Sequence, residues 1–149
     1  MHNNQSLVSI AMASYNGAKY IGEQLDSIIQ QTYTPIEIVI VDDCSKDNTV
    51  AIIQQYQEKF SNIILHINQQ NSGVTKTFEK AIASCRGEFI AISDQDDIWE
   101  LNKIEILVNA IGEHDAVYSN SLLVDGGGQS LNKSFTTIMN MKTYYSGAP

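Results

Sequence analysis

Short apolar runs alternate along this chain with longer segments whose apolar residues recur at helical spacing. Four of the runs are nearly continuous in apolar residues, as is typical of strands that are covered on both faces of a parallel sheet. These predicted strands are Leu7–Ala13, Ile36–Val41, Asn62–Ile67 and Glu88–Ser93. The hydrophobic pattern therefore predicts the centre of a sheet.

The segments between these runs carry apolar residues three or four positions apart, which predicts a helix in each. The predicted helices run from Tyr20 to before Thr32, from a cap at Ser45 or Asp47 through Phe60, from Thr75 to Ser84, and from about Glu100 to Ile111. Strands that alternate with helices are connected by right-handed crossovers. We therefore expect an α/β fold, with a mostly parallel twisted sheet and helices on both faces.

The pattern weakens in the last part of the chain. Ala116–Ser119 is predicted to begin a fifth strand, and Leu122–Val124 to continue it or pair with it. Gly126–Gly128 is predicted to form a turn. Beyond Gln129 no period is clear, so no element is predicted there.

Polar side chains follow three of the predicted strands at the point where each strand ends. They are Ser14–Asn16 after the first strand, Asp42 and Asp43 after the second, and Asp94–Asp97 after the fourth. In open α/β sheets, ligands bind beyond the carboxyl ends of the strands. We therefore expect these three segments to converge on one crevice.

The densest of these segments places Asp94, Asp96 and Asp97 within four positions. Carboxylates this close repel one another by about 1 kcal/mol per pair even in water at ~4 Å, so a cation is a natural partner. Oxygen ligands of this kind suit Mg²⁺ or Mn²⁺. The alternative is a solvated loop whose carboxylates cap the following helix.

Composition narrows the class of protein. At 149 residues, 43% hydrophobic and 17% charged, the chain has the length of one domain and the composition of a globular protein. Its apolar runs are shorter than the roughly 18 residues that a membrane span needs. The net charge of -8 argues against nucleic acid as a partner. Cys44 and Cys85 fit no disulfide framework, which favours reduced thiols in the cytoplasm.

Three other classes of protein that use clustered aspartates do not match the positions of the aspartates in this sequence. A dehalogenase-type phosphatase has its nucleophilic aspartate early in the chain, whereas Asp94 comes late. A calcium-binding loop that starts at Asp94 requires glycine where Trp99 stands. A receiver-type signalling domain carries its acidic pair on the first strand, whereas Asp42 and Asp43 follow the second.

Four motifs, taken together, resemble the nucleotide-sugar domain of the family 2 inverting glycosyltransferases, which have the GT-A fold. The motifs that carry the resemblance are Val8–Gly17, Ile38–Asp47, Asn71–Gly73 and Asp94–Asp97. The similarity extends from about Leu7 to Asp125. The run Ser93–Trp99 with Lys103, and the segment Lys76–Glu79, are similar to a branch of the family that contains bacterial rhamnosyltransferases.

This resemblance implies a role for each residue at the end of the first two strands. Ala13, Ser14 and Tyr15 would line the nucleotide pocket, and Asn16 would belong to the same pocket. Tyr15 and Asn16 could instead be only turn residues. Asp43 would accept hydrogen bonds from the base.

The resemblance also implies a metal site. Asp96 would ligate Mg²⁺ or Mn²⁺ bridging the diphosphate, with Asp94 near the ribose and the metal's water shell. Asp97 would be a supporting or acceptor-side carboxylate, and Lys76 would lie near the nucleotide. The reaction would release a nucleoside diphosphate, whose growing negative charge a metal stabilises.

An inverting transferase also needs a general base for the acceptor hydroxyl. The family places this carboxylate well after the acidic motif, but no Asp or Glu follows Asp125 here. We therefore expect residues 1–129 to be an amino-terminal donor domain, 130–149 to begin a truncated acceptor-side region, and the base to lie beyond residue 149.

The expected function is transfer of a sugar from a dTDP- or UDP-sugar to a glycan or lipid-linked acceptor, in bacterial cell-surface polysaccharide synthesis. The fragment alone is expected to be inactive. Its expected place is the cytoplasm, at the inner face of the membrane through parts outside this chain. The open alternative is a nucleotide-sugar-binding module without catalysis.

Overall fold

The computed structural model describes residues 5–139. Its contacts divide the chain into two compact units, Met1–Glu105 and Ile106–Pro149, with the boundary inside helix α4 (Lys103–Ile111). Whether residues 1–129 act as a donor domain, and residues 130–149 as the start of an acceptor-side region, stays a prediction.

The first unit is built on a parallel sheet of four strands. The strands are β1 (Val8–Ser14), β2 (Ile36–Asp42), β3 (Ile63–Ile67) and β4 (Phe89–Ser93), in the order β3-β2-β1-β4. Every neighbouring pair is parallel, and β1 pairs with β2 from Val8 with Ile36 to Ser14 with Asp42. The predicted α/β fold with a mostly parallel sheet is confirmed.

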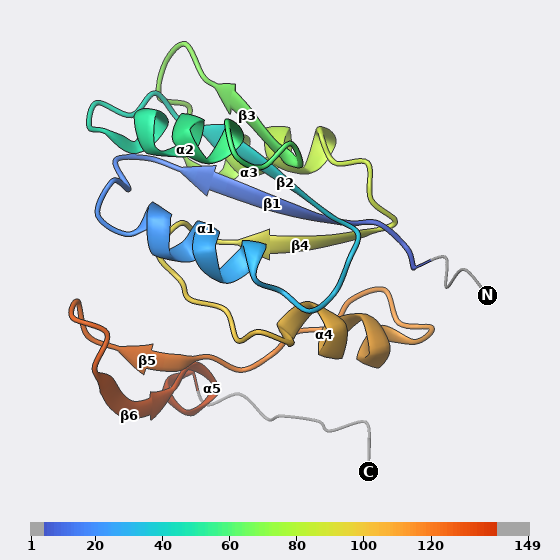
Figure 1. Ribbon diagram of the computed structural model, residues 1–149. Helices are drawn as coiled ribbons and strands as arrows, with labels where there is room; N and C mark the ends of the chain where they lie inside the picture. The colour runs from blue at the N-terminus through green and yellow to red at the C-terminus, as the bar shows by residue number, and fades with distance from the viewer. Residues whose placement is uncertain (1–4, 140–149) are drawn as a thin grey trace. The chain divides into compact units, whose positions relative to one another are not determined.

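Helices cover both faces of this sheet (Figure 1). The connections carry α1 (Ile21–Ile29), α2 (Thr49–Gln57) and α3 (Val74–Ala83). The chain moves from β1 outward to β3 through α1 and α2, and then returns through α3 to β4. Because right-handed crossovers in opposite directions lie on opposite faces, α3 covers the face that α1 and α2 leave open.

The core is densest around the two central strands, which are buried along nearly their whole length. On the α3 face, Ala11 and Val41 pack against Ala81. The other fully buried side chains include those of Ile10, Met12, Leu25, Ile38, Ile40 and Ile53. Strands covered on both faces favour apolar residues on both sides, which explains the nearly continuous apolar runs in the sequence.

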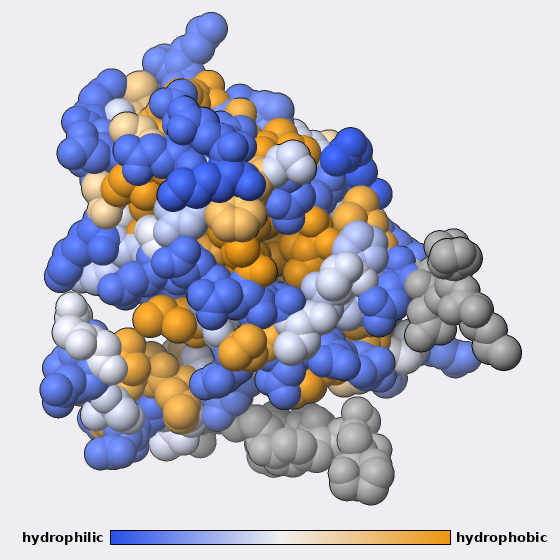
Figure 2. Space-filling model, viewed as in Figure 1, coloured by the Kyte–Doolittle hydropathy of each residue, from blue (hydrophilic) through white to orange (hydrophobic). Residues whose placement is uncertain are grey.

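Strand β4 is different because it ends the order of the sheet. Ile90 and Ile92 are 42% and 54% exposed, and both lie on the face that carries Ala11. Figure 2 shows hydrophobic residues reaching the surface among hydrophilic ones. An apolar edge strand without charged residues is a surface on which another chain can pair.

The second unit contains β5 (Leu122–Val124), β6 (Ser130–Ser134) and the short helix α5 (Phe135–Ile138). β5 and β6 form an antiparallel pair around a turn in which Asp125 accepts hydrogen bonds from Gly127 N and Gln129 N, both at 2.9 Å. The turn predicted at Gly126–Gly128 is therefore confirmed.

Several predicted boundaries are wrong. No strand forms at 116–119, where the chain has no pairing partner among the described residues. Helix α4 begins three residues later than predicted, at Lys103. Helix α2 has Asn48 as its N-cap, although Asp47 still accepts a hydrogen bond from Thr49 N at 3.0 Å. Residues 140–149 lie outside the described part.

No helix within residues 5–139 combines the length and the apolar character needed to cross a bilayer. Cys44 and Cys85 are both free thiols.

Candidate functional site

The carboxyl ends of β1, β2 and β4 meet at one edge of the sheet, and a cavity of about 230 Å³ lies there. It is lined by Ala13, Ser14, Tyr15, Asp43, Asn71, Gly73, Val74, Thr77, Phe78, Asp94, Gln95 and Asp96. Six of the site residues expected from the sequence are therefore brought together here. The crevice predicted from the strand ends exists.

Three expected site residues do not line this cavity: Asn16, Lys76 and Asp97. The amide group of Asn16 is used within the protein, because its Oδ1 accepts a hydrogen bond from Lys46 N at 2.8 Å. Its backbone N–H donates to Ser45 Oγ at 2.9 Å. Lys76 is exposed on the first turn of α3. Whether Asn16 or Lys76 contacts a ligand stays a prediction.

Asp42 is fully buried and serves the structure of the strand ends. Its carboxylate accepts hydrogen bonds from Ser14 Oγ at 2.9 Å, Ser45 N at 2.8 Å and Ser45 Oγ at 2.5 Å. The hydroxyl group of Ser14 is thereby turned towards β2. Asp42 thus joins the end of β1 to the loop that follows β2.

Asp43, also buried, holds the loop between β3 and α3. It accepts hydrogen bonds from Asn68 Nδ2 at 2.9 Å, Ser72 N at 2.8 Å and Gly73 N at 2.9 Å. Burial raises the pKa of Asp43, but these hydrogen bonds outweigh it and hold the pKa below its ordinary value. Both oxygens are therefore engaged before any ligand arrives.

The glycine in this loop has a backbone requirement of its own. Gly73 has a φ of 84°, in the region that side chains with a Cβ rarely adopt. This conformation lets two successive N–H groups, those of Ser72 and Gly73, point at the same carboxylate. The loop wall of the cavity thus depends on one aspartate and one glycine.

The segment Asp94–Asp97 after β4, called the acidic turn below, differs from Asp42 and Asp43 in its hydrogen bonding. Among residues 5–139, no group donates a hydrogen bond to the carboxylates of Asp94, Asp96 or Asp97. Asp94 and Asp96 line the cavity, so their oxygens are available to a ligand there. Asp42 and Asp43 at the end of β2 are thus used within the protein, whereas the aspartates after β4 accept no hydrogen bond from the described residues.

Asp97 lies beside this pair but outside the cavity lining. Burial of its carboxyl group, followed by the charge of Asp94, raises its pKa, and Lys103 opposes the rise. Burial lowers the pKa of Lys103, while Asp97 opposes that shift. The Lys103 ammonium group also lies over the ring of Trp99, 4.5 Å from its centroid. Trp99 is itself buried.

The residues of this edge fit a divalent cation of the hard type. No cluster of three or more His, Cys, Asp or Glu side chains within residues 5–139 could enclose a metal ion. Asp94 and Asp96 nevertheless line the cavity, and they could supply the one or two protein carboxylates that Mg²⁺ usually takes, with substrate phosphates and water completing its shell. Such a site would form only together with a phosphate ligand.

The cavity also contains residues for which the sequence indicates no individual role. Phe78 and Val74 provide an apolar wall from α3, and Gln95 lies between the two free aspartates. Asn71 and Gly73 belong to one of the four motifs in the sequence, but the motif does not indicate what either residue contacts. For Gln95, its position within the motif Asp94–Asp97 was the sequence feature that could have identified it as a site residue.

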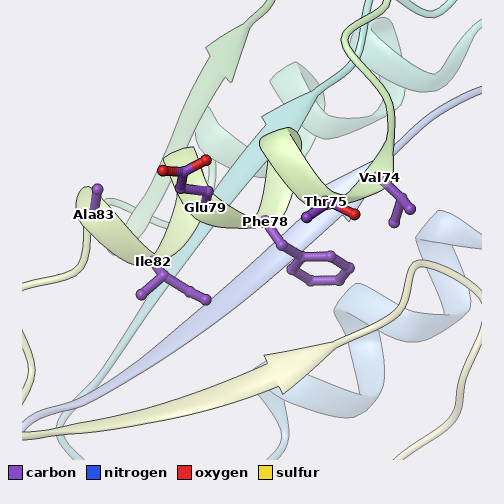
Figure 3. Close-up of a pocket in the computed structure, with 6 residues that line it drawn as sticks. All are labelled: Val74, Thr75, Phe78, Glu79, Ile82 and Ala83. Carbon is purple, nitrogen blue, oxygen red and sulfur yellow. The ribbon is translucent and has the colours of Figure 1, made fainter.

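A second cavity, of about 670 Å³, lies along α3. Figure 3 shows its lining residues, with Phe78 and Ile82 on the same side of the helix. Apart from Glu79 and the hydroxyl group of Thr75, its lining side chains are apolar. It lacks the converging polar groups that orient a small-molecule ligand.

A family model describes most of this chain: the model for glycosyl transferase family 2 matches residues 9–146. The chain belongs to glycosyl transferase family 2. The α/β fold and the acidic edge of the sheet are therefore features of a family member.

Curated relatives agree with this membership. A glycosyltransferase of Nostoc sp. (strain PCC 7120) is 34% identical over 131 residues, which are 87% of this chain and 41% of the relative. The putative teichuronic acid biosynthesis glycosyltransferase TuaG of Bacillus subtilis is 34% identical over 119 residues, 80% of this chain and 47% of the relative. The chain thus spans less than half the length of these relatives.

Solved structures show the same fold. TarS 1–349 of S. aureus, in complex with UDP, is 34% identical with a TM-score of 0.66, over 72% of this chain and 32% of TarS. TarS has also been solved with UDP-GlcNAc. The mannosyltransferase PcManGT from Pyrobaculum calidifontis, with GDP-Man and Mn²⁺, has a TM-score of 0.69 at 24% identity, over 82% of this chain and 36% of that chain.

Proposed function

We propose that this chain is the donor-binding part of a metal-dependent, inverting glycosyltransferase. The observation that carries the proposal is the pair of free carboxylates, Asp94 and Asp96, that face the cavity at the carboxyl edge of the sheet. A diphosphate cannot approach two carboxylates in a protein of charge -8 without a counter-ion. The donor is therefore a nucleoside diphosphate sugar bound together with Mg²⁺ or Mn²⁺.

In this proposal the nucleotide lies between the end of β1 and the start of α3. Ala13, Ser14 and Tyr15 form one side of its pocket, and Phe78 forms an apolar wall opposite. Asp43 accepts a hydrogen bond from the base in this proposal, and it also holds the loop that contains Asn71 and Gly73. The cavity of about 230 Å³ is smaller than a typical small-molecule site of about 300–1,000 Å³, which supports placing the sugar outside it.

The metal would supply electrostatic stabilisation of the departing diphosphate. Asp96 would bind the ion directly, and Asp94 would bind it or its water shell. Asp97 serves the acceptor side. Lys76, on the exposed first turn of α3, neutralises part of the nucleotide's charge. No Asp or Glu follows Asp125, and we assign the general base for the acceptor hydroxyl to none of these 149 residues.

The relatives support a role in cell-surface polysaccharide synthesis. One is assigned to teichuronic acid biosynthesis, and solved neighbours carry UDP, UDP-GlcNAc or GDP-Man. We propose a glycan or lipid-linked acceptor and a dTDP- or UDP-sugar donor. The rhamnosyltransferase-like branch remains the finer proposal, and it predicts a preference for dTDP. The proposed place is the cytoplasm, with membrane association through other parts of the protein.

Titration calorimetry with UDP, dTDP and GDP, with and without Mn²⁺, tests this function. We expect Mn²⁺-dependent binding that Asp96→Asn weakens at least about tenfold, because it removes a charged metal ligand. The matched control is Asp115→Asn, an exposed aspartate outside the site. Absence of binding to all three nucleotides would refute the proposal.

A second measurement separates a transferase part from a non-catalytic binding module. Nucleotide-sugar turnover is measured with the chain alone and with a longer form that extends past residue 149. Turnover only in the longer form supports the donor-half proposal. Robust turnover by the 149-residue chain would contradict it, and binding without turnover in either form would favour the binding module.

A further inference from the structure

Gln95 separates the two free aspartates of the acidic turn, and its side chain is used differently from theirs. Its Oε1 accepts a hydrogen bond from Tyr15 N at 2.9 Å, and its Nε2 donates to Tyr15 O at 3.1 Å. The amide group thus pairs with both polar groups of one backbone residue. A two-point contact of this kind fixes direction as well as distance.

This contact extends the connection between β1 and β4 beyond the sheet. The last paired residues of the two strands are Met12 and Ser93, so no backbone ladder joins the residues after them. Tyr15 is three residues past Met12, and Gln95 is two past Ser93. The Gln95 amide therefore connects the two segments beyond the last backbone hydrogen bonds between β1 and β4, at the level of the cavity.

The backbone opposite Gln95 is shaped to receive it. A Cβ on Gly17 would lie 2.2 Å from Gln95 Oε1 and 2.5 Å from its Cδ. Both distances are far inside van der Waals contact, so a side chain at position 17 and the Gln95 amide cannot occupy their present places together. Gly17 is thus required by this contact, and its φ imposes no such requirement.

The loop that receives Gln95 is itself fixed from the other side. Gly17 N donates to Thr49 Oγ1 at 2.8 Å, and Ala18 N donates to Asp47 Oδ2 at 3.1 Å. The loop is therefore held by the first turn of α2 and the segment before it. Gln95 joins the acidic turn to an anchored support.

We propose that Gln95 is a positioning residue that sets Asp94 and Asp96 against the nucleotide pocket by clamping the backbone of Tyr15. This inference rests on the proposed function, because it assigns the clamp to metal-dependent nucleotide binding. Without the clamp the two carboxylates lose their fixed placement relative to the phosphates. Metal-free binding of a nucleotide is affected less than metal-dependent binding.

The first test replaces the amide by an apolar group of similar length, Gln95→Met. The dissociation constant of UDP is measured by calorimetry without and with Mn²⁺. The constant without Mn²⁺ is divided by the constant with Mn²⁺, and this ratio is compared with that of the wild type. We expect the ratio to fall by about 10- to 100-fold, the range found when outer partners of metal ligands are removed. Metal-free binding should weaken by a smaller factor than binding in the presence of Mn²⁺. The control is Gln55→Met, an exposed glutamine on α2.

The second test disturbs the clamp without touching Gln95. Gly17→Ala displaces the flexible end of the Gln95 side chain and is expected to lower the same ratio. If both variants act through one contact, the double variant Gly17→Ala/Gln95→Met loses no more than either single variant. Additive losses would mean that the two residues act separately, and would overturn the clamp.

The outcomes distinguish this inference from the proposed function. If wild-type binding depends on Mn²⁺ and Asp96→Asn abolishes that dependence, the proposed function stands. An unchanged ratio in Gln95→Met then overturns the inference alone. A wild-type chain that binds no nucleotide overturns both. Circular dichroism and thermal unfolding establish that each variant is folded.

Discussion

Replacing Asp43 by asparagine tests how the loop wall of the cavity is held. The variant has nearly the same shape, but one acceptor oxygen becomes an NH₂ group. If the remaining oxygen keeps Asn68 and Ser72, the new NH₂ group faces Gly73 N, which is also a donor. One hydrogen bond is lost, and two change from a charged to a neutral acceptor.

The expected cost follows from these three bonds. Hydrogen bonds to charged groups contribute about 1.5–3 kcal/mol, and those to neutral groups about 0.5–1.5 kcal/mol. Each of the two weakened bonds therefore costs about 1 kcal/mol. The lost bond costs about 1 kcal/mol more, a low value because Gly73 is exposed and water can reach its N–H group. The total is about 3 kcal/mol, or roughly 10 °C in Tm for a chain of this size.

The assay is urea unfolding followed by circular dichroism, at several pH values. Since the pKa of Asp43 is lowered on folding, its contribution is present above the ordinary value of 3.8 and is lost as the pH falls through the folded value. The gap between wild type and Asp43→Asn should therefore be widest near pH 7 and shrink below about pH 4.

Asp115→Asn, at an exposed position, is the matched control and should leave the free energy of unfolding unchanged. If the free energy of unfolding of Asp43→Asn lies within about 0.5 kcal/mol of the wild-type value at pH 7, the reasoning is refuted, because even an ordinary surface substitution can change stability by that amount. So would a gap that does not depend on pH.

Two further predictions concern residues outside the cavity. Glu37 is buried, and its Oε2 accepts from Arg86 Nη2 at 2.6 Å and Nε at 2.9 Å. Burial raises the pKa of Glu37, but its hydrogen bonds and the charge of Arg86 lower the pKa overall. Glu37→Gln should therefore lower the free energy of unfolding by about 2 kcal/mol at pH 7, and the difference from wild type should disappear as the pH falls below the ordinary pKa of 4.5. Urea stabilities that differ by the same amount at every pH would contradict this. Ile92→Lys places a charge on the exposed α3 face of the edge strand β4 and should reduce any concentration-dependent self-association in sedimentation velocity, with stability unchanged. Equal association of wild type and variant would show that this edge does not pair.

Much of the first unit follows from the sequence alone. The runs at Val8–Ser14 and Ile36–Asp42 are apolar at nearly every position because both faces of a central strand are covered. Parallel order then brings their carboxyl ends to one edge. Convergence of the polar segments is a consequence of topology, which requires no knowledge of side-chain contacts.

The second unit could not be predicted in this way. β6 (Ser130–Ser134) has no apolar alternation, and it forms because the turn at Asp125 brings it beside β5. The apolar residues at 116–119 resemble a strand, but they have no pairing partner among the described residues. A strand depends on its neighbour, and short runs carry little information about which neighbour they find.

For the site, the sequence by itself determined which segments meet, and the tertiary structure decided what each side chain does there. Asp43 and Asp96 have the same chemistry and both follow a strand. Asp43 is engaged by groups 25 to 30 residues away, whereas Asp96 accepts no hydrogen bond within the described part. Gln95 finds its partner in Tyr15, 80 residues earlier in the chain. Such contacts depend on distances of a few ångströms between distant segments, which only the folded chain sets.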